Sequence, residues 1–185
     1  MAKRVSLFKV LRRELGAQIS AEGFTEVPQD ASERTSILMY FRDSSRGKSL
    51  GFWFQRDLKS MYVDALGSAF TMEFFRSIDD PYEMDSRERV YFLLNAAERE
   101  EMRDLQNNMI KRLPPLETVL ESWELKIAGE FAKPYRKVIS KPFNPRTDVW
   151  MRYRDEEDLV SWTSFIGRIL PSLIERFDIA MPRSS

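Results

Sequence analysis

The sequence predicts an α+β fold, with an antiparallel or mixed sheet of about five or six strands covered by about four helices. Three observations lead to this prediction. A helical period near the start of the chain gives way, after Gly23, to short aromatic and β-branched runs. Helical periods return in the second half of the chain, with one more strand between them. The composition, 43% hydrophobic and 31% charged over 185 residues, is typical of one globular domain covering residues 1-185.

The first predicted helix covers residues 6-22. Ser6 is its predicted N-cap, because a serine hydroxyl can accept a hydrogen bond from the free amides of the first turn. The apolar residues that follow at spacings of 3, 4 and 4 are Phe8, Leu11, Leu15 and Ile19. Gly23 is expected to end the helix, because glycine readily adopts the left-handed conformation that closes helices.

A meander of strands is predicted over residues 24-76. Its candidate strands are Phe24–Val27, Thr35–Phe41, Leu50–Gln55, Met61–Ala65 and Ala69–Arg76. The dipeptide at residues 67–68 is either a tight turn or a bulge in one long strand. Successive apolar residues in 37–41 and 52–54 place apolar side chains on both faces of the central strands. The second face is therefore either covered or a binding surface.

The second half of the chain is predicted to be mainly helical. After an acidic loop at residues 79–85, Arg89–Leu94 is either a strand or the first turns of a helix, and the strand is favoured. The remaining predicted elements are helices at 96-113 and 116-132, a strand at 148-153 and a helix at 156-177. Asn95 and Glu98 have capping-box spacing. Pro171 lacks an amide hydrogen, so the last helix is expected to kink or divide near it.

Three segments of this arrangement form a recognisable pattern: the closure at Gly23-Phe24, the aromatic strand at 52–54, and the strand at 148–153 with Asp155 and Asp158 after it. Together they resemble small uncharacterised bacterial proteins that are grouped as domains of unknown function. The resemblance spans most of the chain and consists of packing patterns. It implies the α+β architecture and brings no catalytic residue, and the immunity and stress-associated proteins in some such families are an analogy for function by binding.

Histidine and cysteine are both absent from the sequence. Their absence excludes Ser-His-Asp triads, cysteine nucleophiles, the common zinc sites, cysteine-ligated iron–sulfur clusters and disulfides. The seven glycines form no phosphate-cradling cluster. We therefore expect no cofactor, and the balance is against an enzyme.

Charge and hydropathy favour a cytoplasmic protein that does not bind membranes. Lys+Arg and Asp+Glu number 29 each, so the chain has no overall field that would attract nucleic acid or anionic lipid. No run approaches the roughly 18–20 apolar residues that cross a bilayer. Lys9, Arg12 and Arg13 interrupt the apolar stretch that a signal peptide requires.

The first candidate binding site is a basic loop with aromatic residues among its charges. Its candidate partner-binding residues are Lys133, Tyr135, Arg136, Lys137, Lys141 and Arg146. Guanidinium and ammonium groups bind phosphates or carboxylates, and rings stack on bases. A solvated loop whose charges pair with acids elsewhere in the fold explains the same residues and is favoured.

The second candidate is an aromatic sheet face around Trp53, with Tyr40 and Tyr62 as neighbours. Such a face could form an apolar pocket or a protein-docking surface. Core packing explains the same residues and is favoured, because aromatic side chains in strands are more often buried than functional.

The leading functional hypothesis is a non-enzymatic binding or interaction module with a protein partner; nucleic acid is a less favoured partner. One alternative is a carboxylate-dependent hydrolase or transferase, with magnesium as an option. Such an enzyme would use Asp or Glu side chains from the strand ends. The acidic run Asp155–Asp158 could hold a magnesium ion, but it also suits the first turn of a helix, which is the favoured explanation. The other alternative is a small-ligand-binding domain with an aromatic pocket between the sheet and the last helix.

Overall fold

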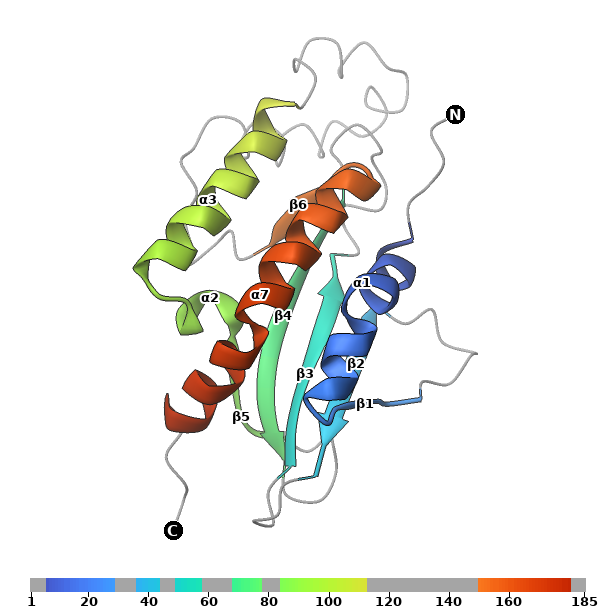
Figure 1. The fold of residues 1–185 in the computed structure, drawn as a ribbon, viewed down its shortest axis with the longest axis vertical. Coiled ribbons are helices and arrows are strands. Elements are labelled where there is room, and N and C mark those ends of the chain that lie inside the picture. Colours follow the sequence, from blue (N-terminus) through green and yellow to red (C-terminus); the bar gives the residue numbers. More distant parts are fainter. Residues whose placement is uncertain are drawn as a thin grey trace.

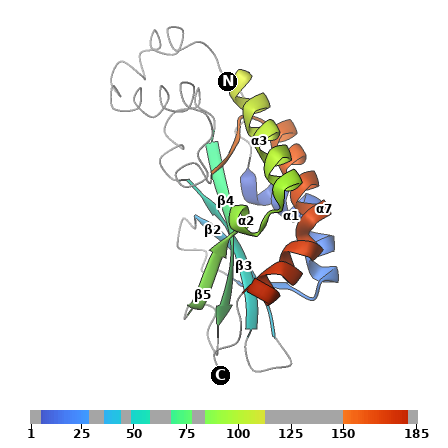
Figure 2. The same ribbon diagram turned by 90° about the vertical axis from the view of Figure 1, so that its left-hand side faces the viewer.

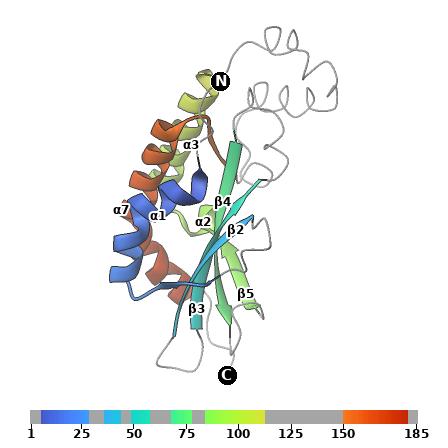
Figure 3. The same ribbon diagram turned by 90° about the vertical axis from the view of Figure 1, so that its right-hand side faces the viewer.

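The chain forms an antiparallel sheet with helices packed against one face (Figure 1). The structure is a computed structural model, and it describes residues 6–28, 36–43, 49–57, 68–77, 84–112 and 150–180. The side views show α1, α3 and α7 in a layer beside the sheet (Figures 2 and 3). The predicted α+β class is confirmed, and the sheet is antiparallel rather than mixed.

The sheet order is β1-β2-β3-β4-β5, and β6 also pairs with β4. The strands are β1 (Thr25–Glu26), β2 (Ile37–Arg42), β3 (Ser49–Arg56), β4 (Ser68–Ser77), β5 (Met84–Arg89) and β6 (Met151–Tyr153). The helices of the described ranges are α1 (Leu7–Ala21), α2 (Val90–Leu93), α3 (Ala96–Lys111) and α7 (Glu156–Ala180). Because β5 pairs with residues 73–77 of β4 and β6 with residues 68–70, these two strands share one edge of β4.

The main core lies between the sheet and the helices. Side chains alternate between the two faces of a strand, and the even-numbered residues of β2, β3 and β4 point toward the helices. Phe52 lies at the centre of this layer, with its ring centroid 5.0 Å from that of Phe24 and 5.4 Å from that of Phe74. The helix residues buried against the sheet include Leu11, Leu15, Leu159, Trp162, Ile166 and Phe177.

A second, smaller cluster occupies the opposite face of the sheet. It consists of Met39, Trp53 and Phe75, with partly buried Ile37 and Phe41 beside them. The rings of Trp53 and Phe75 stack with their centroids 5.1 Å apart. The prediction that the central strands carry apolar side chains on both faces is therefore confirmed.

The segment that follows the meander corrects one expectation. The strand favoured at Arg89–Leu94 is instead the short helix α2, and the strand lies earlier, at β5. β5 is an edge strand of mostly polar residues, and its side chains at positions 86–89 are exposed or half-buried, so it shows no alternating apolar pattern. It is held by the β4 ladder and by an ion pair between Arg89 and Glu73, Nε to Oε1 2.9 Å. The helix expected at 116-132 lies outside the described residues.

The last helix is not divided at Pro171: α7 runs from Glu156 to Ala180 as one element. A proline in a helix leaves the carbonyl four residues earlier without its usual amide donor. Here that carbonyl, Gly167 O, accepts a hydrogen bond of 2.5 Å from Gln18 Nε2 of α1. A Cβ at Gly167 would lie 2.8 Å from Gln18 Oε1, so glycine allows the two helices to approach this closely. None of the helices in the described ranges has the length and hydropathy to span a bilayer.

The start of α3 is tied to α7 through Glu98. The predicted capping box is confirmed: Asn95 Oδ1 accepts from Glu98 N at 2.9 Å, and Glu98 Oε2 accepts from Asn95 N at 2.8 Å. Arg176 of α7 donates from Nη2 to Glu98 Oε1 at 2.9 Å. This bond from Arg176, assisted by the Asn95 amide, holds the pKa of Glu98 below its ordinary value.

This pKa shift predicts a pH dependence of stability. A carboxylate with a lowered folded-state pKa stabilises the fold above its unfolded pKa, and that contribution is lost as pH falls through the folded pKa. We expect Glu98→Gln to unfold more easily than wild type at pH 7, and the difference to shrink below about pH 4.5. Urea denaturation from pH 3 to pH 7 measures the destabilisation at pH 7 and its decrease at low pH. Asp104→Asn, at an exposed carboxylate of the same helix, is the control; a difference from wild type that grows at low pH would contradict the prediction.

Candidate functional site

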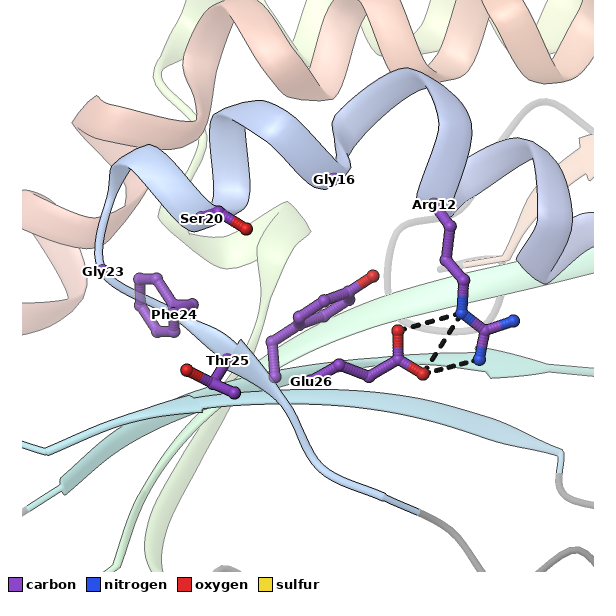
Figure 4. A pocket seen from close by; sticks show the side chains of 8 residues that line it. Arg12, Gly16, Ser20, Gly23, Phe24, Thr25 and Glu26 are labelled. Atoms are coloured by element: carbon purple, nitrogen blue, oxygen red, sulfur yellow. Dashed lines mark hydrogen bonds and ion pairs between the residues drawn. The ribbon is translucent and has the colours of Figure 1, made fainter.

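The candidate site is a pocket of about 550 Å³ between α1 and the first two strands, here called the α1–β1 pocket (Figure 4). Its lining residues are Arg12, Gly16, Ser20, Gly23, Phe24, Thr25, Glu26 and Tyr40. Pockets that hold small ligands have volumes of roughly 300–1,000 Å³. The α1–β1 pocket is large enough to hold a small molecule.

The wall formed by α1 follows from the helical repeat. Arg12, Gly16 and Ser20 are spaced by four residues and therefore lie along one face of the helix. Gly16 has no side chain, and a Cβ placed there would meet no atom within 4 Å. The pocket is open at Gly16 because the helix has no side chain to fill the gap.

The turn after α1 places β1 beneath the helix. Gly23 has φ +82°, a conformation that strains any residue with a Cβ. Gly23 N donates to Ser20 O at 3.0 Å and Phe24 N donates to Ile19 O at 3.2 Å, which closes the helix. The chain then returns as β1 and supplies the lower wall of the pocket in Figure 4. The predicted helix end at Gly23 is confirmed.

One ion pair joins the two walls. Arg12 Nε lies 2.9 Å from Glu26 Oε2, and Arg12 Nη2 lies 2.6 Å from Glu26 Oε1. Hydrogen bonding to Glu26 raises the pKa of Arg12 above its ordinary value. The side chains are 50% and 37% exposed, and exposed pairs of this kind contribute at most about 1 kcal/mol to stability. The pair can therefore open at little cost to the fold.

Tyr40 contributes a phenol to the pocket from β2. Its ring packs on Phe52, with the centroids 5.4 Å apart, and the residue is only 4% exposed. Burial, with a smaller contribution from the nearby Glu26 carboxylate, raises the pKa of Tyr40 to about 12. The phenol is thus protonated at neutral pH. Within the described ranges its hydroxyl makes no hydrogen bond to another protein group.

The structure separates two residues that were expected to be neighbours. Tyr40 pairs with Phe52, whereas Trp53 pairs with Met39, so the two side chains point to opposite faces of the sheet. Tyr40 lines the α1–β1 pocket, while Trp53 belongs to the smaller cluster on the opposite face, here called the outer cluster. Among the described residues, the buried Nε1 of Trp53 has no hydrogen-bond partner. The expectation of one aromatic surface around Trp53 that includes Tyr40 was wrong. Tyr62 lies outside the described residues.

The aromatic pocket predicted between the sheet and the last helix stays a prediction. There the ring centroids of Phe74 and Phe177 are 5.6 Å apart, and neither residue is exposed. The α1–β1 pocket lies elsewhere, between α1 and the strands β1 and β2. The basic residues Lys133, Tyr135, Arg136, Lys137, Lys141 and Arg146 fall outside the described residues, so their role in partner binding stays a prediction.

The acidic run at the start of α7 has a structural role. Asp155 Oδ1 accepts from Asp158 N at 3.0 Å, which caps the helix. Asp158 Oδ2 accepts from Arg154 N at 2.8 Å, and the Asp158 carboxylate also pairs with Arg112. Among the described residues, no group of three or more acidic side chains is placed to hold a metal ion.

Of the eight lining residues, the sequence analysis proposed only Tyr40 as a binding residue. The three most important of the seven that it missed are Arg12, Gly16 and Glu26. Gly16 appears in the sequence only as a glycine inside a helical pattern, and Arg12 and Glu26 are 14 residues apart. The sequence contained one partial indication of the pocket. None of positions 12, 16 and 20 has an apolar side chain, and these positions lie on one face of α1 beside its buried stripe.

Comparison with known proteins adds no further assignment. No protein-family model matches the chain, and no curated protein sequence matches it. The resemblance to bacterial domains of unknown function therefore stays a prediction, and the function is argued from the geometry of the pocket.

Proposed function

We propose that the chain is a non-enzymatic binding protein and that the α1–β1 pocket is its ligand site. The observation that carries this proposal is the open space at Gly16, in the middle of a helix whose other face is tightly packed. Glycine inside a helix costs about 0.8–1.0 kcal/mol relative to alanine. Glycine at position 16 therefore lowers the stability of the helix and leaves space that a ligand can occupy.

The chemistry of the lining also favours binding over catalysis. Glu26 is the one carboxylate among the eight lining residues, and it is paired with Arg12. Hydrolysis of glycosides and similar bonds uses a second carboxylate as acid or nucleophile. The lining instead offers a buried phenol, one ion pair and the hydroxyls of Ser20 and Thr25, which can orient a ligand by hydrogen bonds.

The test is a small-molecule screen monitored by amide chemical shifts. We expect compounds that bind to shift the amide signals of residues 12–26 and Tyr40. We expect Gly16→Leu to abolish these shifts because the leucine side chain projects into the middle of the pocket and blocks it. Leucine is a better helix former than glycine, so the variant should fold at least as stably as wild type. Thermal unfolding checks this.

Ala17→Leu is the matched control, because it adds a leucine at the next, exposed position of the same helix, outside the pocket lining. It should bind as wild type does. The proposal is overturned if no compound shifts the pocket signals of wild type, or if the shifts persist in Gly16→Leu.

A further inference from the structure

The charges of the α1–β1 pocket restrict what it can bind. Its charged lining residues are Arg12 and Glu26, which have opposite signs and touch each other at one end of the pocket (Figure 4). A ligand with a single charge would be attracted by one of them and repelled by the other at a similar distance. A ligand that presents an anion and a cation a few ångströms apart is attracted by both.

The ion pair is able to exchange partners with such a ligand. Both side chains are substantially exposed, and they come from different elements, α1 and β1. A ligand carboxylate can take the two-donor position on the Arg12 guanidinium that Glu26 now occupies. A ligand ammonium can then pair with the released Glu26, so that no charge is left without a partner.

Beyond the ion pair the pocket becomes aromatic. Gly16 leaves a flat stretch of helix wall, and Phe24 and Ser20 lie at the end away from Arg12 (Figure 4). Tyr40, from β2, also lines the pocket. Rings attract a further ring in edge-to-face or offset arrangements, and the Tyr40 hydroxyl can form a hydrogen bond with a polar group.

We propose that the α1–β1 pocket binds a free α-amino acid with an aromatic side chain, its carboxylate on Arg12, its ammonium on Glu26 and its ring toward Tyr40 and Phe24. This inference rests on the proposed function, because it names the ligand class of the same pocket.

Calorimetric titration of the whole chain with L-phenylalanine and two analogues tests the charges. Phenylalaninamide lacks the carboxylate, and 3-phenylpropanoate lacks the ammonium. We expect L-phenylalanine to bind at least about tenfold more tightly than either analogue, since each analogue leaves one member of the ion pair without a partner. L-alanine, which keeps both charges but lacks the ring, should also bind more weakly.

The double variant Arg12→Gln with Glu26→Gln removes both charges at exposed positions. It should remove the preference for L-phenylalanine over the two analogues, and Gly16→Leu should remove binding altogether. The inference is overturned if either analogue binds wild type as tightly as L-phenylalanine, or if the double variant keeps the preference.

The two proposals fail in different ways. If L-phenylalanine does not bind but other compounds shift the pocket signals of wild type and not those of Gly16→Leu, the amino-acid assignment falls and the binding function stands. If no compound of either kind binds in a manner that Gly16→Leu abolishes, both fall.

Discussion

Phe52→Ala should lower the free energy of unfolding by roughly 3–5 kcal/mol, the usual cost of removing a buried phenylalanine ring. Phe52 is fully buried, and its ring neighbours four others, those of Phe24, Tyr40, Phe54 and Phe74. Three of these rings are on the strands β2, β3 and β4, and Phe24 directly precedes β1, so their backbones hold them apart around the space that is left. Urea denaturation measures the loss.

Phe92→Ala is the matched control for this change, because Phe92 is 47% exposed. A surface substitution away from special features changes stability by about 0.5 kcal/mol or less. If the two variants differed from each other by less than about 1 kcal/mol, Phe52 would not be at the centre of the core.

Gly51→Ala should destabilise the fold by about 1–3 kcal/mol, because the added methyl group enters occupied space. A Cβ at Gly51 would lie 2.1 Å from Cζ of Phe75, and two further atoms of that ring lie within 2.7 Å. Phe75 is fully buried and stacked on Trp53, so its ring cannot move aside without disturbing the outer cluster.

The sign of the stability change in Gly51→Ala shows whether the space beside Gly51 is occupied. A glycine in the interior of a strand is ordinarily destabilising by about 0.5–1 kcal/mol relative to alanine, so alanine would stabilise β3 if the space were free. Gly16→Ala adds the same methyl group where no atom lies within 4 Å, and it should raise the free energy of unfolding by about 0.8–1.0 kcal/mol. Stabilisation by Gly51→Ala would show that the Phe75 ring does not cover Gly51.

The helices were predictable because each buries one regular stripe. The apolar spacing placed the first, second and last predicted helices within a few residues of α1, α3 and α7. Capping residues marked two of their starts, at Asn95 and Asp155. Periodicity is informative there because packing on one side forces the same residue type to recur every three or four positions. β5 lacks such a pattern, and its position was missed.

The pocket was not predictable, because it depends on strand register and on a missing side chain. Tyr40 and Trp53 both belong to aromatic strands, and only the pairing of Tyr40 with Phe52 shows that they face opposite sides. A shift of one residue would have placed them on the same face. Gly16 contributes to the site by what it lacks, and no residue pattern distinguishes such a glycine from one that is merely tolerated.

The hydrogen bond from Gln18 to Gly167 also has a consequence for folding kinetics. It joins residues 149 positions apart, and it forms where Pro171 leaves the Gly167 carbonyl free. Contacts between distant segments require a large loop to close, and proteins rich in them fold slowly. α1 packs on both the sheet and α7, so its packing is complete only when α7 is in place. The α1–β1 pocket, whose upper wall is α1, is therefore expected to be among the last parts of the molecule to assemble.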